Sequence, residues 1–352
     1  MSAKRKLIII GAAVLVILAA GFAVTRLLAV SYNNRGLDLA EKNKTADAIK
    51  LFDKSIRLNP RFSAAFANRG MARSKQGDFS GAMRDLDKAV SLDPEDPNPL
   101  NERGLLHYRE RNFKLAIRDF NKAIKLNPDV AILYANRGAA FADKGDFSRA
   151  SKDFSAALKN DRNCPEAFYF RGLSELKTRN YESAAMDFKK VIELNPKNTD
   201  ALVGLGNTFL AKNDPYNAII YFCEAIQIDA KKAAAYAGRG IAYSRKKIYG
   251  AAIDDFTQSI AYNPSDAVAY MNRGVTYSIT GKNDSALADF SSAIRLNPNF
   301  QWAFFARGNA YARMKNNSRA IEDFNMFIQL SQNPADRLKA EQRIRELSKS
   351  SF

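Results

Sequence analysis

A glycine recurs at one fixed interval along most of this chain. Nine of its 18 Gly residues are separated by gaps of 34 residues, far more than chance would place on a single phase. They are Gly36, Gly70, Gly104, Gly138, Gly172, Gly206, Gly240, Gly274 and Gly308. A period of this length indicates a repeat array, in which each unit packs mainly on its neighbours. Residues 29–334 therefore divide into nine 34-residue units, with residues 1–28 before them and 335–352 after them.

The pattern inside each unit predicts two helices. An aromatic residue or Leu stands four positions before every Gly, as Tyr134 precedes Gly138, and this spacing places both on one helical face. In the second half, an Ala and a Phe or Leu recur four residues apart, often with a small residue three later, as in Ala116, Phe120 and Ala123. Turn residues separate the halves, and Pro closes six units because it cannot continue a helix. We expect an all-α fold whose Gly and Ala lie where two helices cross closely.

These features resemble the tetratricopeptide repeat (TPR) family. The resemblance rests on the 34-residue period, aromatic-x3-Gly, Ala-x3-Phe-x2-Ala and the closing Pro, and it covers residues 29–334. The form YANRG at 134–138 is similar to that of many bacterial members. The resemblance implies a right-handed α-solenoid of nine helical hairpins, whose concave face binds proteins or peptides. It does not identify a partner.

The residue before the Gly departs from the family pattern, which usually has an aliphatic residue there. Eight of nine units have Arg, and seven of these have Asp sixteen residues later. The seven sets are Arg69 with Asp85, Arg103 with Asp119, Arg137 with Asp153, Arg171 with Asp187, Arg239 with Asp255, Arg273 with Asp289, and Arg307 with Asp323. Unit six lacks both and has Leu205 and Tyr221. Joint presence and joint absence predict an ion pair inside each hairpin, which makes these Arg poor candidates for nucleic-acid contacts.

Groove residues follow from the resemblance, since the first helix of each unit lines the groove in TPR folds. Two positions before the Gly stand Asn34, Asn68, Asn136 and Asn272, and further candidates by phase are Asn207, Tyr108 and Tyr169. In some TPR superhelices such Asn residues hold the main chain of an extended peptide, because an amide both donates and accepts. The alternative is that the Asn residues serve helix packing and the Tyr residues fill the core. The family's carboxylate clamp is not expected, because its Lys positions hold residues such as Asn33 and Ala67.

The N-terminal segment has a long apolar run behind a basic start. Lys4, Arg5 and Lys6 precede residues 7–25, which carry no charge. Nineteen helical residues span about 28 Å, close to the ~30 Å core of a bilayer. We expect an uncleaved transmembrane anchor within residues 1–28; the alternative is a cleaved signal peptide and a secreted or periplasmic array. Positive charge on the short end favours a cytoplasmic N-terminus and repeats in the periplasm of a bacterial inner membrane.

Composition argues against several classes of function. One His and two Cys leave no two-His metal site, no Cys-rich zinc module and no disulfide scaffold. There is no phosphate-binding Gly loop and no nucleophile elbow. His107 takes a position that holds Tyr in later units and is expected to pack, while Cys164 and Cys223 are nearly two units apart. We therefore expect no enzymatic activity, no cofactor and no metal.

The net charge of 54 − 37 = +17 permits acidic proteins, nucleic acid or anionic lipid as partners. Basic residues gather where first helices end, among them Lys75, Arg245 and Arg313. They complement the helix dipole or form a basic rim along the groove. The main expectation is a membrane-tethered scaffold that binds peptide or protein segments in its groove. The alternative is a basic solenoid that docks on nucleic acid or anionic lipid.

The C-terminal end combines aromatic residues with a polar tail. Phe300, Trp302, Phe304 and Phe305 form an aromatic cluster in unit nine. The tail, residues 335–352, predicts a polar helix with Leu338, Ile344 and Leu347 on one side. Because a repeat array must cover its last apolar face, we expect this helix to cap the cluster.

Overall fold

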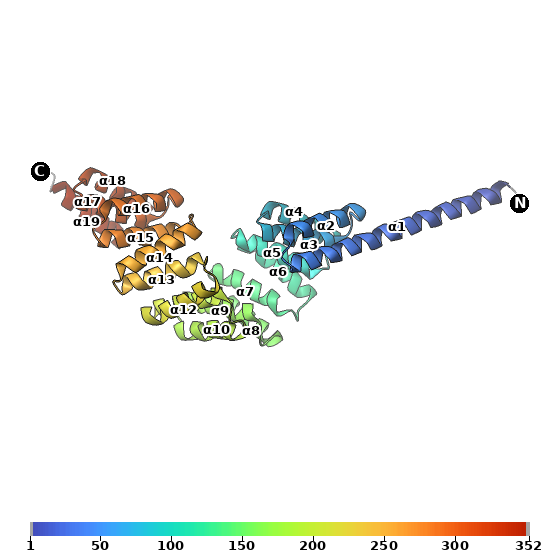
Figure 1. Ribbon diagram of the computed structural model, residues 1–352, viewed down its shortest axis with the longest axis horizontal. Helices are drawn as coiled ribbons and strands as arrows, with labels where there is room; N and C mark the ends of the chain where they lie inside the picture. The colour runs from blue at the N-terminus through green and yellow to red at the C-terminus, as the bar shows by residue number, and fades with distance from the viewer. Residues whose placement is uncertain (1–2, 350–352) are drawn as a thin grey trace. The chain divides into compact units, whose positions relative to one another are not determined.

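The computed structural model describes residues 3–349, and their side chains from residue 21 onward. These residues form nineteen helices and no strand, which confirms the all-α repeat fold (Figure 1). The chain divides into two compact units, residues 1–174 and 175–352, and the division falls inside α9 (Pro165–Lys177). Each 34-residue repeat supplies two helices, and α19 follows the ninth repeat.

In the first unit, each first helix packs against the second helix that follows it in sequence. Its helices before α9 are α1 (Ala3–Glu41), α2 (Thr45–Leu58), α3 (Ser63–Gln76), α4 (Phe79–Leu92), α5 (Pro97–Arg109), α6 (Phe113–Leu126), α7 (Ala131–Asp143) and α8 (Phe147–Asn160). Second helices also contact the next first helix, as α2 contacts α3. The helices therefore stack in sequence order.

The second unit repeats this arrangement with a final single helix. Its helices are α10 (Tyr181–Leu194), α11 (Thr199–Ala211), α12 (Pro215–Ile228), α13 (Ala233–Arg245), α14 (Tyr249–Tyr262), α15 (Ala267–Ile279), α16 (Asn283–Leu296), α17 (Gln301–Arg313), α18 (Asn317–Leu330) and α19 (Pro334–Lys349). Apart from α1 and α19, the helices span three to four turns each, which is ordinary for globular proteins.

The repeated Gly marks the point where the two helices of a hairpin cross. A Cβ added to Gly206 would lie 2.7 Å from Cε1 of Phe222, and one added to Gly274 would lie 2.8 Å from Cε1 of Phe290. Such distances are too short for real contacts, so the Phe ring occupies the space that a side chain would need. Both rings are fully buried. The close crossing predicted from the period is therefore a Gly–Phe contact.

Every first helix is followed, within two residues of its end, by a residue with positive φ at the same point of the repeat. That residue is Gly77, Gly145 or Gly281 in three repeats. In the other six it is Asn43, Arg111, Arg179, Asn213, Lys247 or Lys315. Left-handed backbone is readily adopted by Gly and tolerated by Asn, but it is unfavourable for a longer side chain. Its occurrence at Arg and Lys shows that packing of the two helices determines this turn.

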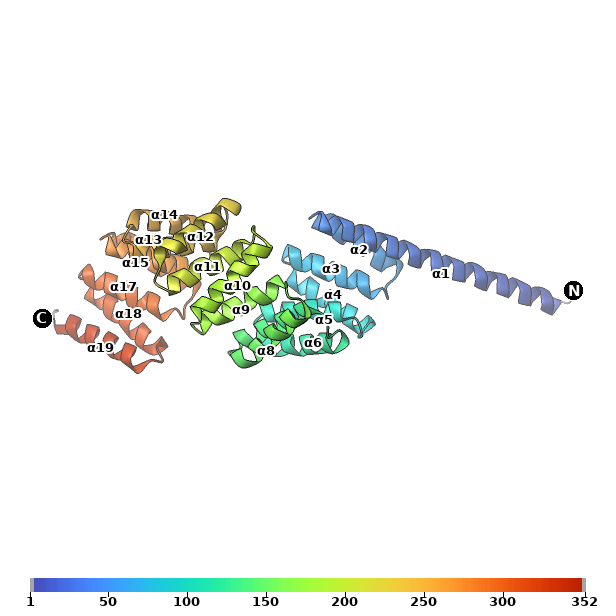
Figure 2. The same ribbon diagram turned by 90° about the horizontal axis from the view of Figure 1, so that it is seen from below.

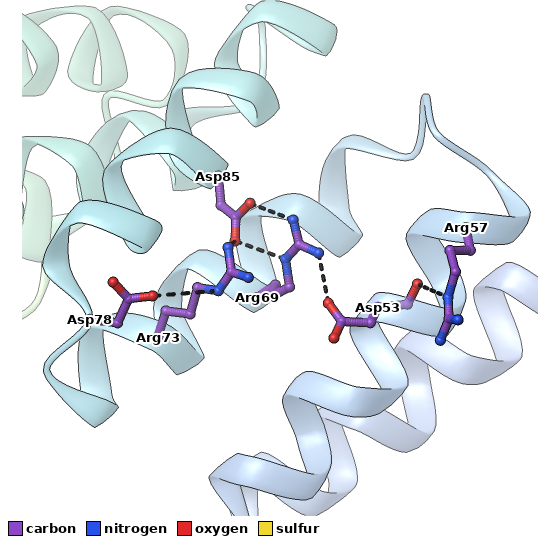
Figure 3. Close-up of polar contacts among 6 residues, drawn as sticks. All are labelled: Asp53, Arg57, Arg69, Arg73, Asp78 and Asp85. Carbon is purple, nitrogen blue, oxygen red and sulfur yellow. Dashed lines mark hydrogen bonds and ion pairs between the residues drawn. The ribbon is translucent and has the colours of Figure 1, made fainter.

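The predicted ion pairs inside the hairpins are confirmed. In six repeats the Arg donates through Nε and Nη2 to both oxygens of the Asp sixteen residues later, at 2.6–2.9 Å. Figure 3 shows this fork for Arg69 and Asp85, which Arg73 also contacts. The Asp side chains are buried. Hydrogen bonds to Asp289 raise the pKa of Arg273 above its ordinary value, so this guanidinium stays charged.

The third nitrogen of the same Arg reaches back to the preceding repeat, which the sequence pattern did not predict. Nη1 of Arg69 donates to Oδ1 of Asp53 at 2.7 Å, from α3 to α2 (Figure 3). The residue sixteen positions before each Arg accepts this bond in all six repeats. The acceptors are Asp53, Asp87, Asn121, Cys223, Thr257 and Ser291. Each of these guanidinium groups therefore joins three helices of two adjacent repeats.

The tail helix α19 lies beside α18 at the end of the second unit (Figure 2). Ala340 and Leu347 of α19 are buried against Phe304, Phe324 and Phe327. The predicted cap is therefore confirmed. The prediction for Leu338 was wrong, since 51% of this residue is exposed. Ala340 takes the covered position because it lies seven residues, or about two helical turns, before Leu347 and so shares its face of the helix.

The helix α1 runs without a break from Ala3 to Glu41. Its last turns belong to the first repeat, where Ala29 is buried and its carbonyl accepts a hydrogen bond from Oγ of Ser55 at 2.7 Å. Most of the predicted anchor, residues 7–20, lies outside the residues whose side chains are described. Within the described part of the chain, no helix is both long and apolar enough to span a bilayer.

Candidate functional site

The first helices of consecutive repeats touch one another directly, as α1 touches α3 and α15 touches α17. Within the part of the chain that the structure describes, pockets open between such helices in both units, and two of them are compared below. The first, of about 260 Å³, lies between α1 and α3 above Phe52 of α2. The second, of about 410 Å³, lies between α15 and α17 above Phe290 of α16. Both floors are formed by the Phe that the repeated Gly contacts.

Equivalent repeat positions line the two pockets. Asn68 in the first and Ala306 in the second stand two residues before the repeated Gly. The residue five positions after that Gly is also shared, as Lys75 in the first pocket and Arg313 in the second. The pockets thus arise from the repeat geometry, and the surface between neighbouring first helices is the candidate binding surface.

The pocket between α1 and α3, called here the N-terminal pocket, has a mixed rim. Leu37, Ala40 and Met71 form apolar walls. Glu41 and Lys75 lie on opposite helices at its edge, so the rim carries one charge of each sign. Lys75 is already engaged, since its Nζ donates to Oδ1 of Asn43 at 2.7 Å.

The pocket between α15 and α17, called here the C-terminal pocket, is larger and has more aromatic residues in its lining. Met271, Val275 and Ile279 of α15 face Trp302 and Phe305 of α17 across it. Arg313 of α17 and Arg343 of the cap helix α19 close the rim. Its volume lies within the ~300–1,000 Å³ typical of ligand pockets. The site therefore combines an aromatic floor with two guanidinium groups.

The structure places two of the predicted Asn residues in bonds between neighbouring first helices. Nδ2 of Asn68 donates to Oδ1 of Asn33 at 2.9 Å. Nδ2 of Asn136 likewise donates to Oδ1 of Asn101 at 2.9 Å, and Asn136 is only 5% exposed. Both bonds connect residues 35 positions apart in sequence. Asn68 also lines the N-terminal pocket.

The remaining Asn candidates do not converge on one pocket. Asn34 and Asn207 are exposed, and Oδ1 of Asn34 accepts a long hydrogen bond from Asn33 at 3.4 Å. Asn272 is half-buried, and its carbonyl accepts from Oγ1 of Thr276 at 2.8 Å. Asn34 belongs to the first unit and the other two belong to the second.

The two predicted Tyr residues are half-buried in the first unit. The hydroxyl of Tyr108 donates to Oδ2 of Asp143 at 2.5 Å, which connects α5 to α7. Burial, and then the bond to Asp143, raise the pKa of Tyr108 well above its ordinary value, so its hydroxyl stays protonated. Tyr169 packs edge-on against Phe170 with ring centroids 5.6 Å apart.

The C-terminal pocket was not predicted as a binding site. Sequence reasoning assigned Trp302 and Phe305 to capping, and the cap does cover part of this cluster. Trp302 nevertheless remains 40% exposed and lines the pocket. The available signal was the position of Arg313, five residues after the Gly, where basic residues recur.

No arrangement for catalysis or metal binding is found among the described residues. They contain no group of three His, Cys, Asp or Glu side chains placed to hold a metal ion. His107 is half-buried, with Nε2 3.9 Å from Oδ2 of Asp119. Asp119 itself accepts the fork of Arg103, so this His lies beside a structural ion pair.

Family models match much of the chain. One model, described as a tetratricopeptide repeat, matches residues 97–130 and 267–300. A second model with the same description matches residues 33–97, 137–188 and 169–237. The matched residues together make up more than half of the chain. No curated protein sequence matches it.

Solved structures share the fold at low sequence identity. A tetratricopeptide repeat protein from Parabacteroides merdae is 18% identical with a TM-score of 0.59, over 71% of this chain and 99% of that one. Yeast Tom70 is 16% identical with a TM-score of 0.56, over 93% of this chain and 90% of that one. The APC/C hetero-tetramer Cut9-Hcn1 gives 20% identity and a TM-score of 0.64 over 78% of this chain. The chain spans about half, 54%, of that last relative.

Proposed function

Because the chain belongs to the tetratricopeptide repeat family, whose members are non-enzymatic scaffolds for protein–protein interaction, we propose that it binds an extended segment of a partner protein between its first helices. The family relation supports the general role. The two pockets support the location, since they lie on the same surface of the repeat.

The repetition of the pocket is the observation that carries this proposal. A pocket formed by chance would not recur at equivalent positions in two units of the chain. Here the floor Phe, the position two before the Gly and the position five after it recur in both. An extended peptide also projects side chains at regular intervals, and alternate ones point to the same side. Each pocket can therefore take one side chain of a linear segment of a partner.

The physical basis of binding would be burial of apolar side chains in preformed pockets. Apolar burial contributes about 25 cal/mol per Å² removed from water. The walls are helices that already pack on their neighbours, so little ordering cost opposes binding. Polar groups at the rims then select the segment and its register.

Selection of peptides from a random display library, with the full chain in detergent as bait, tests the proposal. The variant with Met71→Trp and Ala306→Trp fills both pockets with large rings. We expect selected peptides to bind this variant at least tenfold more weakly, because the space for their side chains is lost. Binding is measured by fluorescence anisotropy of labelled peptides.

A matched control carries Lys88→Trp and Ala288→Trp on the second helices α4 and α16, where both residues are exposed. This control should bind like the unchanged chain. Circular dichroism checks that both variants keep their helices. Equal binding by the pocket-filled variant and the control would contradict the proposal.

The proposal includes a membrane tether formed by residues 7–25. Its support is the uncharged run of nineteen residues behind Lys4, Arg5 and Lys6, in a segment whose backbone continues into the first repeat as one helix. Apolar side chains remain exposed beyond this run, at Leu27, Leu28 and Val30. A positive N-terminal end favours repeats on the far side of the membrane.

Carbonate extraction and N-terminal sequencing of the expressed chain test the tether. A retained anchor predicts an intact N-terminus in the carbonate-resistant pellet, together with protease access from the periplasmic side. A mature chain that begins near residue 22 would indicate a cleaved signal instead. An intact chain in the carbonate supernatant would exclude both forms.

A further inference from the structure

We propose that the C-terminal pocket binds a large apolar side chain of a partner peptide while Arg313 binds an adjacent Asp or Glu of the same peptide. This inference rests on the proposed function and adds the chemistry of the ligand. It concerns the second unit alone, because all lining residues lie on α15, α16, α17 and α19.

The apolar part of the pocket is open to solvent. Ile279 is 52% exposed and Trp302 is 40% exposed, although both are large apolar residues. Trp302 is held in place from behind, with its ring centroid 5.1 Å from that of Phe327 and 5.8 Å from that of Phe305. An incoming aromatic or aliphatic side chain would cover a preformed surface, and aromatic pairs add about 0.5–1.5 kcal/mol beyond area burial.

Arg313 is held at the rim by neutral partners. Its Nη1 and Nη2 donate to the carbonyl and the hydroxyl of Ser278, at 3.5 and 2.5 Å. Both bonds link α17 back to α15, so they fix the guanidinium beside the pocket. Among the described residues, Arg313 forms no ion pair with a carboxylate. A guanidinium has five N–H donors, so several remain for a ligand.

The other rim charge, Arg343, pairs only with a residue of its own helix. Its Nη1 lies 2.6 Å from Oε2 of Glu346, and the side chains of both are exposed in part. Exposed pairs at this spacing contribute little, so Glu346 can yield to a ligand carboxylate. The rim thus carries two positive charges, and the carboxylate nearest to Arg343 is the exposed one of Glu346.

Charge distinguishes this pocket from its N-terminal equivalent. The position of Ile279 in the C-terminal pocket is that of Glu41 in the N-terminal pocket, five residues after the Gly. In the N-terminal pocket, Glu41 would repel an acidic peptide. At the C-terminal pocket it meets Ile279, Arg313 and Arg343 instead. The chain's net charge of +17 adds a general attraction for acidic partners.

The fluorescence of Trp302 reports directly on binding at this pocket, because it is the single Trp of the chain. The probes are three nine-residue synthetic peptides with Gly-Ser-Gly flanks. One has Phe between two Glu, one has Phe between two Lys, and one has Ser between two Glu. We expect the Glu-Phe-Glu peptide to change Trp302 emission saturably in the full chain in detergent. The other two should bind at least tenfold more weakly.

The variant Arg313→Gln should weaken the Glu-Phe-Glu peptide at least tenfold. Its matched control is Arg245→Gln, because Nη1 of Arg245 donates to the carbonyl of Leu210 in the same way, 35 residues back. This control loses the same kind of link between repeats and should leave the titration unchanged. If Arg313→Gln fails to fold, a salt titration of the unchanged chain still tests the role of charge. Rising salt should weaken binding of the Glu-Phe-Glu peptide.

Equal binding of all three peptides, or no saturable change with any of them, would overturn the inference. A change of Trp302 emission with protein concentration alone would assign the pocket to a second copy of the chain, which also overturns it. Display selection separates this result from the proposed function. Pocket-dependent peptides without an acidic–apolar pair would uphold the proposed function and refute only the ligand chemistry.

Discussion

Repeat eight and repeat six have different side chains at the same two positions, one on each helix of the hairpin. In repeat eight, Arg273 forks onto Asp289 at 2.8 Å and reaches back to Oγ1 of Thr257 at 3.0 Å. In repeat six, Leu205 takes the place of the Arg and is fully buried. Tyr221, in place of the Asp, stacks on Phe209 with ring centroids 5.4 Å apart.

What the two repeats share is the Gly–Phe crossing, where a Cβ added to the Gly would lie 2.7 Å from Cε1 of the Phe in repeat six and 2.8 Å from it in repeat eight. The ion pair can therefore be replaced by apolar side chains, whereas the crossing is present in both repeats. This agrees with the general finding that buried ion pairs add less net stability than their geometry suggests. The comparison indicates that the Gly–Phe crossing is what the fold requires. The register of the two helices can be set by either side-chain pair, Arg with Asp or Leu with Tyr.

Breaking the pair in repeat eight should have the largest effect. Asp289→Ala leaves Arg273 with Thr257 as its only described side-chain acceptor. We expect the free energy of unfolding to fall by about 3 kcal/mol, near the lower limit for breaking a buried pair. Urea unfolding followed by far-ultraviolet circular dichroism measures the loss, and hydrogen exchange locates it in α15 and α16.

The double variant Arg273→Leu with Asp289→Tyr is the control, because it installs the pair of repeat six. Its free energy of unfolding should lie within about 1 kcal/mol of the unchanged chain. If the double variant is as unstable as Asp289→Ala, the apolar solution depends on the surroundings of repeat six and is not transferable.

Filling the crossing should affect both repeats equally. Gly206→Ala and Gly274→Ala each force a methyl group against a buried Phe ring. Overpacking costs about 1–3 kcal/mol, and Ala recovers up to ~1 kcal/mol of helix propensity, so a net loss of about 1–2 kcal/mol is expected. Both are measured by urea unfolding.

Gly250 in α14 provides the matched control, since nothing lies within 4 Å of a Cβ added there. Gly250→Ala should leave stability unchanged or raise it by up to ~1 kcal/mol. A clear difference between the variants at Gly206 and Gly274 would show that the crossing is not the element the repeats share.

The smallest effect is expected at the junction between repeat six, which lacks the ion pair, and repeat seven, which has it. Nη1 of Arg239 in repeat seven donates to Sγ of Cys223 in repeat six at 3.2 Å, and the same atom of Arg307 donates to Oγ of Ser291 at 3.1 Å. Since sulfur is a weak acceptor, Cys223→Ser should raise stability by about 0.5 kcal/mol. Thermal unfolding measures it, and Ser291→Cys should shift stability in the opposite direction.

Contacts inside a repeat could be predicted from the sequence, because they recur at fixed spacing. The joint loss of Arg and Asp in repeat six was enough to predict the pairing of Arg273 with Asp289. Contacts between repeats were harder. The acceptors of Nη1 include Asp53, Asn121 and Cys223, which share no side-chain chemistry and so leave no pattern.

The candidate site was predicted only in part for the same reason. Two of the Asn residues that stand two before the Gly, Asn68 and Asn136, form bonds between first helices, and Asn68 also lines the N-terminal pocket. Their partners Asn33 and Asn101 stand 35 residues earlier and are identified only once neighbouring helices are packed. Trp302 could serve the cap, the pocket or both, and only the exposed fraction of its side chain distinguishes these roles.

The Nη1 atom of the repeated Arg donates to many kinds of acceptor, and this affects how a chain of such repeats can change in length. A carboxylate, an amide, a hydroxyl and a thiol all satisfy Nη1 from the preceding repeat. Duplication or loss of a whole 34-residue block in the gene would thus leave a guanidinium with an acceptor at the new junction, except directly after repeat five, where Lys189 stands at this position. Copy number can therefore change at most junctions without loss of this bond, and the length of the surface formed by the first helices changes with it.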